Sequence, residues 1–266
     1  MLDRFNRNIN YLRISVTDRC NLRCIYCMPE EGVKLIRHDD ILTYDEITGF
    51  TREAVAMGIT KVRLTGGEPL ARKGITTLIA MLAGIGGITD LSMTTNGTML
   101  AENADDLAAA GLMRVNISLD TLDPGKYHRV TRGGDISNVL EGIIAAQNAG
   151  LRPVKINCVI KSTPDEDDAR MVAAFCMREG LEVRFIRQMD LAGGTFSVVH
   201  GGSGGHCARC NRLRLTPEGI VRPCLFNDIG YSIRELGAAE ALKRAVENKP
   251  EKGTVNHVNG FYNIGG

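Results

Sequence analysis

Six short runs rich in β-branched residues recur along the first two thirds of the chain, and amphipathic stretches separate them. The runs predict strands at 12–16, 62–65, 91–95, 115–119, 154–160 and 183–186. The stretches predict helices at 43–57, 75–83, 101–110, 136–149 and 165–179, the first opening with a capping box of Thr43 and Glu46. Alternating strands and helices require a parallel sheet with helical crossovers. We therefore expect an α/β protein whose sheet is closed or partly closed, like a barrel.

The alternation stops after Asp190, where a glycine-rich passage leads toward the second of two cysteine groups. A β-hairpin of 213–215 and 220–222 is expected there, followed by a helix over 232–248. We place a domain boundary at this point, with a barrel over 1–190 and a small α+β domain over 191–266. Within the junction, 196–205 is expected to form one strand and a flexible turn.

Composition excludes several classes of protein. The 266 residues carry 32 Lys and Arg against 31 Asp and Glu, a formal net charge of +1. Near neutrality argues against holding a nucleic acid by bulk charge, although it permits a local basic pocket. The N-terminus lacks the apolar core of a signal peptide, and no stretch is long enough to span a bilayer. We expect a cytoplasmic protein without nucleic-acid or membrane partners.

Eight cysteines in a reducing compartment point to metal or cluster ligands where they are grouped. Cys20, Cys24 and Cys27 follow the first predicted strand within one loop. Three thiolates suit three irons of a [4Fe-4S] cube and leave the fourth iron open. The alternative is zinc, which needs a fourth ligand, and His38 is the nearest candidate and badly placed. We favour the cluster. Cys158 and Cys176 stand alone and are expected in the core.

The loop Cys20-x3-Cys24-x2-Cys27, with Tyr26, and the run Gly66-Gly67-Glu68-Pro69 after the second strand resemble the radical S-adenosylmethionine (SAM) superfamily. The resemblance implies a partial (βα)6 barrel in which the open iron binds SAM. A reduced cluster then cleaves SAM to a 5′-deoxyadenosyl radical. The resemblance further implies that the glycines let the backbone approach the methionine moiety of SAM. It also implies that Glu68 contacts the amine of SAM and that Tyr26 contacts the adenine.

The other end of the chain resembles the GTP 3′,8-cyclases of molybdenum cofactor biosynthesis, through Cys207-x2-Cys210-Asn211-Arg212-Leu213-Arg214, Arg222-Pro223-Cys224 and the terminal Gly265-Gly266. The resemblance implies a second [4Fe-4S] cluster on Cys207, Cys210 and Cys224, whose free iron binds guanine. The implied reaction converts GTP to (8S)-3′,8-cyclo-7,8-dihydroguanosine 5′-triphosphate. A zinc knuckle with His206 or His200 as fourth ligand is the alternative for this group.

A triphosphate requires several fixed cations. The basic residues that match the family's positions around GTP are Arg13, Lys61, Arg63, Lys155, Arg212 and Arg214. Arg212 and Arg214 alternate with leucines, so on a strand both point to one face. Thr94, Ser118 and Arg184 match positions that contact SAM, and Gly265 and Gly266 match a tail that assists the radical step. The alternative for the basic residues is an ordinary solvated charge. For Thr94, Ser118 and Arg184 it is strand-end capping or surface charge, and for Gly265 and Gly266 it is a frayed tail.

Two departures from the family concern the substrate. The junction at 191–206 is much shorter than usual, and the sixth strand continues Arg187-Gln188-Met189-Asp190 where an acidic and aromatic pair is common. A peptide or another nucleotide therefore stays open as substrate, as does a partner that completes the site. The cluster needs a reductant such as a flavodoxin or ferredoxin, and the sequence is compatible with a monomer or a homodimer.

Overall fold

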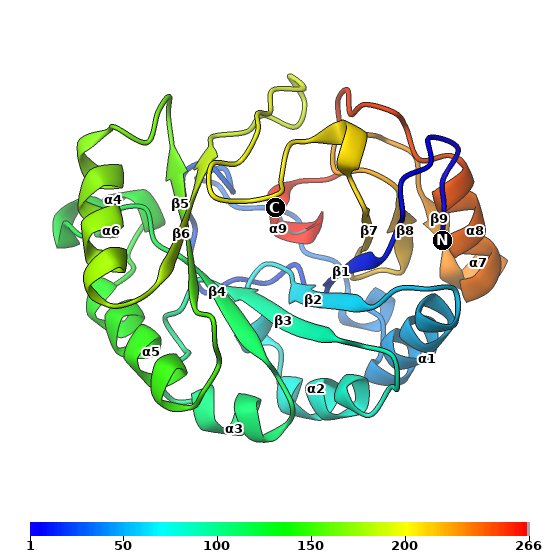
Figure 1. The fold of residues 1–266 in the computed structure, drawn as a ribbon, viewed down its shortest axis with the longest axis horizontal. Helices are drawn as coiled ribbons and strands as arrows, with labels where there is room; N and C mark the ends of the chain where they lie inside the picture. Colours follow the sequence, from blue (N-terminus) through cyan, green and yellow to red (C-terminus); the bar gives the residue numbers. More distant parts are fainter. Residues whose placement is uncertain (265–266) are drawn as a thin grey trace.

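A single curved sheet forms the centre of the molecule in the computed structural model, which describes residues 1–264 (Figure 1). The strands are β1 (Tyr11–Ser15), β2 (Lys61–Thr65), β3 (Asp90–Thr95), β4 (Arg114–Ser118), β5 (Lys155–Ile160), β6 (Glu182–Arg187), β7 (Arg212–Leu215), β8 (Ile220–Arg222) and β9 (Tyr231–Ser232). Their order is β6-β5-β4-β3-β2-β1-β7-β8-β9. Strands β1 to β7 run parallel, and β8 and β9 add antiparallel neighbours. The sheet does not close, which confirms the α/β class and the partial barrel.

The helices of the barrel lie around the outside of this sheet (Figure 1). They are α1 (Tyr44–Ala56), α2 (Ile75–Ala83), α3 (Ala104–Ala109), α4 (Pro124–Thr131), α5 (Ile136–Asn148) and α6 (Asp167–Arg178). The capping box predicted for the first helix is present, because Thr43 Oγ1 accepts from Glu46 N while Glu46 accepts from Thr43 N. The pattern missed α4, which begins at Pro124 behind the N-cap of Asp123. No helix among residues 1–264 is long and apolar enough to cross a membrane.

The C-terminal part adds its strands to the same sheet. It contains α7 (Ile233–Leu236), α8 (Ala238–Glu247) and α9 (Phe261–Ile264). The helix predicted over 232–248 is interrupted at Gly237, whose φ of 78° ends α7 before α8 begins. Leu213 and Leu242 belong to the same hydrophobic core as Leu12 of β1. The division into two domains at 190 stays a prediction, and sheet and core continue across it.

The junction at 191–206 forms two isolated bridges in place of the expected strand. Phe185 exchanges backbone hydrogen bonds of 3.0 Å with His200, and Asp190 pairs with Thr195. The junction therefore folds back along β6. Short glycine-rich turns permit this return, since Gly201 and Gly205 adopt φ values of 76° and 81°.

The two faces of the sheet differ in chemistry, and this difference positions the site. The outward residues of β1 and β2, such as Leu12, Ile14, Val62 and Leu64, have no exposed surface because the helices cover them. The alternate residues point inward and are polar or charged on most strands. A barrel interior lined by polar side chains is suited to a polar ligand rather than to a packed core.

Candidate active site

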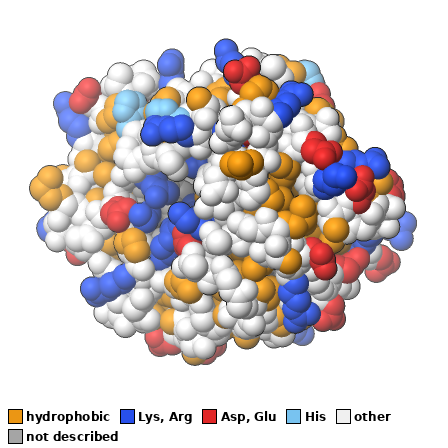
Figure 2. Space-filling view, turned by 45° about the vertical axis from the view of Figure 1, so that its right-hand side comes forward, with side chains coloured by type: hydrophobic (Ala, Val, Ile, Leu, Met, Phe, Trp, Pro, Cys, Tyr) orange, Lys and Arg blue, Asp and Glu red, His pale blue; other side chains and the backbone are white. Residues whose placement is uncertain are grey.

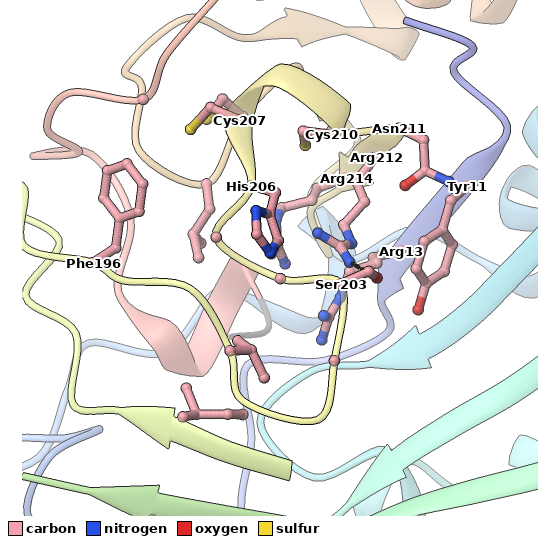
Figure 3. A pocket seen from close by; sticks show the side chains of 18 of the residues that line it. Tyr11, Arg13, Phe196, Ser203, His206, Cys207, Cys210, Asn211, Arg212 and Arg214 are labelled. Atoms are coloured by element: carbon pink, nitrogen blue, oxygen red, sulfur yellow. Dashed lines mark hydrogen bonds between the residues drawn. The ribbon is translucent and has the colours of Figure 1, made fainter. Parts of the chain in front are cut away.

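A cavity of about 330 Å³ lies on the inner face of the sheet, and its lining joins the barrel strands, the junction and the second cysteine group. Figure 3 shows Cys207 and Cys210 near one another on its wall, with Arg13 and Tyr11 toward β1. The space-filling view shows Lys and Arg side chains gathered around a hollow on this side of the molecule (Figure 2). Asp90 is the only acidic residue of the described part of the chain on this lining, and Arg114 binds it through two hydrogen bonds.

Register places the cations of three neighbouring strands in rows. Arg13 of β1 lies between Arg63 of β2 and Arg214 of β7. In the next row, Tyr11 lies between Lys61 and Arg212, and its ring meets the guanidinium groups of Arg63 and Arg212 at 5.6 and 5.7 Å. Parallel partners in register point to the same face of a sheet. Five of the six predicted substrate contacts thus line the cavity together.

The three cations of the first row, Arg63, Arg13 and Arg214, are crowded against one another. Burial lowers the pKa of both Arg63 and Arg214 to about 10, and Arg212 adds to the shift of Arg214. Burial and then the charge of Arg214 also lower the pKa of Arg13. Crowded guanidinium groups favour a polyanionic ligand, whose negative charge would raise these pKa values again.

Lys155, the sixth predicted substrate contact, lies apart from the lining and forms an ion pair with Glu182 of β6. Arg214 also donates to the carbonyl of Ile264 (3.3 Å), so the last turn of α9 lies near the cation rows. Gly265 and Gly266 lie outside the described residues, and their predicted catalytic part stays a prediction. The short junction contributes Phe196, Ser197, Val199 and 202–205 to the wall of the cavity.

The second cysteine group borders the same cavity and leaves room there. Cys207, Cys210 and Cys224 all line it. Gly253 lines it too, and a Cβ at this position would approach Cys224 Sγ to 3.3 Å and Phe226 Cβ to 2.8 Å. Burial raises the pKa of Cys210, but the positive charges of Lys249, Arg212 and Arg214 outweigh it and the pKa is lowered overall. A thiolate that is favoured in this way suits binding to an iron.

The first cysteine group is built on one turn at the carboxyl end of β1. Cys27 N and Met28 N donate to the carbonyl of Cys24 (2.9 and 3.0 Å), which wraps the loop around its own backbone. Leu22 N and Asn96 Nδ2 donate to Cys20 Sγ at 3.5 and 3.8 Å. Burial and then mutual repulsion raise the pKa of Cys24 and Cys27 to about 12.

Each group offers three free, partly buried thiols, a donor set that suits a [4Fe-4S] cube with one iron left open. No three His, Cys, Asp or Glu side chains in the described part of the chain are arranged around one metal ion. In a cube each thiolate binds a different iron, so its three thiols stand further apart than the ligands of a zinc ion. The iron charge also offsets the repulsion that raises the pKa of the first thiols. The residues at both positions therefore fit the group that the sequence predicts.

The glycines after β2 dock against the strand-end loop that leads to Cys20. Gly67 N donates to Thr17 O (2.7 Å), and a Cβ on Gly67 would overlap the carbonyl oxygen of Arg19. A Cβ on Gly66 would lie 2.6 Å from Thr17 O. Glycine is required here because two backbone segments of the chain approach closely, and the predicted approach of the same backbone to the methionine of SAM stays a prediction.

Glu68 connects the ends of β2 and β3. Its Oε1 accepts from Thr95 Oγ1 (2.7 Å) and Leu70 N (3.1 Å), and its Oε2 accepts from Asn96 N (2.7 Å). Burial raises the pKa of this carboxyl, and the three hydrogen bonds oppose that shift. Since Asn96 also contacts Cys20, Glu68 helps to set the position of the first cysteine loop. Its predicted contact with the SAM amine stays a prediction.

Of the remaining predicted SAM contacts, Thr94, Ser118 and Arg184 lie on β3, β4 and β6, and Tyr26 lies in the first cysteine loop. Only Arg184 of these four lines the cavity among residues 1–264. Tyr26 donates to Asp120 Oδ2 (2.7 Å), and burial together with that carboxylate raises its pKa. Thr94 Oγ1 and Arg184 Nε are buried and have no hydrogen-bond partner among residues 1–264. Ser118 is in register with Asn157, which is in turn in register with Arg184. Unpartnered buried polar atoms are expected where a ligand binds.

Sequence reasoning missed several residues of the site. Tyr11, Asp90 and Arg114 line the cavity through strand register, and the alternation of polar residues on β1, β3 and β4 is the signal that could have found them. Arg7 and Lys249 lie beside the second cysteine group through contacts of high sequence separation. No local pattern marks either of them.

Comparison with known proteins agrees with this geometry. The family model described as Radical SAM superfamily matches residues 14–176. A protein of Thermodesulfovibrio yellowstonii named GTP 3′,8-cyclase is 42% identical over 305 aligned positions, which cover 94% of this chain and 95% of the relative. A protein of Moorella thermoacetica with the same name is 43% identical and covers 94% of both chains. The chain belongs to the GTP 3′,8-cyclase family of radical SAM enzymes. The alignment exceeds the 266 residues of this cyclase homologue, so the first relative has segments that it lacks.

Solved structures confirm the fold of this radical SAM enzyme. SuiB of Streptococcus suis, bound to its precursor peptide SuiA, matches 91% of the chain with a TM-score of 0.69 and 15% identity, and the match covers 65% of SuiB. The native structure of anSMEcpe with bound AdoMet matches 91% of the chain with a TM-score of 0.64 and 15% identity, covering 81% of anSMEcpe. Membership of the superfamily implies a [4Fe-4S] cluster and SAM. A bound cluster and SAM supply a 5′-deoxyadenosyl radical.

Proposed function

We propose that this enzyme converts GTP to (8S)-3′,8-cyclo-7,8-dihydroguanosine 5′-triphosphate. The observation that carries the proposal is one cavity that joins two rows of cations, with Arg63 and Arg214 buried, to the second cysteine group. A nucleoside triphosphate matches both ends of such a cavity, with a polyanion at one end and a base at the other. The names of the relatives support GTP as the nucleotide.

The side chains divide the work of binding. Arg13, Arg63 and Arg214 hold the triphosphate, since guanidinium groups bind phosphate oxygens through two hydrogen bonds at once. Cys207, Cys210 and Cys224 hold a second [4Fe-4S] cluster that meets the guanine. Anchoring both ends of the nucleotide fixes the ribose between them, and such positioning lowers the barrier by removing rotational freedom.

The first cysteine loop holds the cluster that binds SAM, with Tyr26, Gly66, Gly67, Glu68, Thr94, Ser118 and Arg184 around the cofactor. The 5′-deoxyadenosyl radical takes the hydrogen from ribose C3′ and becomes 5′-deoxyadenosine, and the C3′ radical that remains bonds to guanine C8. The purine radical formed in this way takes up one electron and one proton to give the 7,8-dihydro product. A flavodoxin or ferredoxin supplies two electrons per turnover, one for the cleavage of SAM and one for this last reduction. The junction walls the cavity through Phe196, Ser197 and Val199, which supports GTP binding despite its short length.

Anaerobic incubation of reconstituted enzyme with SAM, dithionite and GTP tests the proposal. We expect 5′-deoxyadenosine and a cyclised nucleotide to form in equal amounts. Mass spectrometry measures both products. Arg63→Met should weaken GTP binding by roughly 10-fold to 150-fold, since a lost hydrogen bond to a charged group costs about 1.5–3 kcal/mol. Arg52→Met, at an exposed position of α1, serves as the control. Formation of 5′-deoxyadenosine without a GTP product would contradict GTP as the substrate.

A further inference from the structure

Two buried cations bind the backbone of the second cysteine group from outside it. Arg7 precedes β1, and Lys249 follows α8. Arg7 donates to the carbonyl oxygen of Cys207 (2.8 Å), and Lys249 Nζ donates to those of Arg212 (2.7 Å) and Pro223 (2.5 Å). Every segment that carries a cysteine of this group therefore has a carbonyl bound by one of the two cations.

The same cations bring the C-terminal chain against the cysteines. Arg7 also donates to the carbonyls of Pro250 (2.7 Å) and Glu251 (3.0 Å), the two residues that follow Lys249. These contacts span more than 200 residues of sequence. They hold the start of the segment that contains Gly253, where a Cβ would lie 3.3 Å from Cys224 Sγ. The N-terminal loop and the C-terminal segment thus meet behind the cysteines.

The charges of the two cations are balanced differently. Arg7 Nε is bound to Asp3 Oδ2 at 2.6 Å, and both side chains are almost fully buried. Lys249 is only 1% exposed and forms no ion pair with a carboxylate within residues 1–264. Its ammonium group lies instead on the carbonyls of Arg212 and Pro223, in the segments that carry Cys210 and Cys224. A buried cation without a carboxylate requires another negative group nearby.

We propose that Arg7 and Lys249 are positioning residues of the second cluster: they hold its three cysteine segments in place, and Lys249 also compensates the cluster's negative charge. This inference rests on the proposed function, which places a [4Fe-4S] cluster on these cysteines. Cluster potentials depend on net charge and on hydrogen bonds near the sulfurs. Removing the positive charge destabilises the more negative reduced cluster, so the reduction potential should fall.

Reconstituted full-length variants test the two roles separately. Lys249→Met removes the hydrogen bonds and the charge, whereas Lys249→Gln removes the charge and keeps two N–H donors. Arg7→Met removes the bond to Cys207. Lys243→Met on the exposed face of α8 and Arg4→Met in the N-terminal loop are matched controls. A variant with Cys207, Cys210 and Cys224 all changed to Ala serves as the reference without the second cluster.

Three quantities are measured for each variant. They are the iron and sulfide content, the electron paramagnetic resonance signal during a redox titration, and the 5′-deoxyadenosine formed without GTP. We expect Lys249→Met and Arg7→Met to lose up to about half of the iron, like the triple variant, because the two clusters have equal iron content. Their SAM cleavage should stay at the level of the triple variant, which shows that the barrel is folded. Lys249→Gln should retain more of the second cluster, at a lower potential than in the unaltered enzyme.

The outcomes separate the two proposals. Equal iron in the triple variant and the unaltered enzyme would overturn the second cluster itself, and the proposed function with it. Loss of iron in the triple variant, with full iron in Lys249→Met and Arg7→Met, would overturn only the positioning role. An unchanged potential in Lys249→Gln would overturn the role of the charge.

Discussion

The two cysteine groups reach similar chemistry through different kinds of construction. Cys20, Cys24 and Cys27 lie on one loop that turns around the carbonyl of Cys24. Cys207, Cys210 and Cys224 are brought together by a 3-10 turn, a hairpin and two distant cations. Local sequence determines most of the first geometry, whereas the second depends on long-range contacts. The second group should therefore be more easily lost, while the first survives.

The largest expected difference is between single cysteine variants. Cys24→Ala removes one of three ligands from the loop that binds SAM, and we expect SAM cleavage to be abolished. Cys210→Ala should retain uncoupled cleavage and lose the nucleotide product, because the barrel loop is unchanged. Quantifying 5′-deoxyadenosine with and without GTP distinguishes the two. Equal loss of cleavage in both variants would show that the groups do not work separately.

Two glycines sharpen the comparison without changing a ligand. Gly67→Ala places a methyl group against the carbonyl of Arg19 and should displace the first cysteine loop. Gly253→Ala places one 2.8 Å from Phe226 Cβ, beside Cys224. Each should cost about 1–3 kcal/mol of stability, the usual penalty for overpacking. Chemical denaturation measures this cost, and cluster spectra should show a defect in the first group for Gly67→Ala and in the second for Gly253→Ala. The reverse assignment would refute the local action of each glycine.

Thiol reactivity in the metal-free chain gives a smaller effect, which depends on pH. The pKa of Cys210 is lowered from 9.0, whereas those of Cys24 and Cys27 are raised to about 12. Only the thiolate is alkylated, so iodoacetamide at pH 8 to 9 should modify Cys210 well before Cys24 and Cys27. Peptide mass spectrometry over a pH series measures the order. Lys249→Met should slow the alkylation of Cys210. Faster alkylation of Cys24 than of Cys210 in the unaltered chain would contradict the difference in pKa between the two groups.

The smallest effect concerns an ion pair distant from the cavity, between Glu46 of α1 and Arg234 of α7. The Arg234 hydrogen bond lowers the pKa of Glu46 from 4.5 to about 2. Glu46→Gln keeps the capping box but removes the ion pair, at a cost of about 0.2–1 kcal/mol for a partly exposed pair. A lowered pKa stabilises the fold above pH 4.5 and loses that effect as pH falls toward 2. Denaturation curves of Glu46→Gln and of the unaltered chain should therefore differ less at pH 3 than at pH 7. The spectra of both cysteine groups should not change.

Much of the barrel could be predicted because its signals are local. The helix at 75–83 is α2 as observed, and the six barrel strands lie within a few residues of the predicted runs. The helix predicted at 232–248 was too long, because an apolar period continues through Gly237 although its backbone does not. The first cysteine loop could be predicted for the same reason, because its three cysteines lie close together in the sequence.

The rest of the site depends on pairing that no local pattern reveals. Arg13 lies between Arg63 and Arg214 only because β7 joins the sheet beside β1. Lys249 is a lone lysine near a helix end, which by its sequence alone resembles an ordinary surface charge. Arg7 likewise gains its importance from Pro250 and Glu251 at the other end of the chain.

The pairing of β1 with β7 has a consequence for how the protein is made. On the ribosome, β1 emerges first, and its partner follows about 200 residues later, a delay of about 10 to 40 seconds at ordinary elongation rates. During that interval one edge of β1 lacks its final neighbour, while the loop with Cys20 is already outside the exit tunnel. All three cysteines of the first loop are therefore outside the ribosome before β7 has been made, whereas the segments of Cys207, Cys210 and Cys224 can be joined only once Lys249 has emerged.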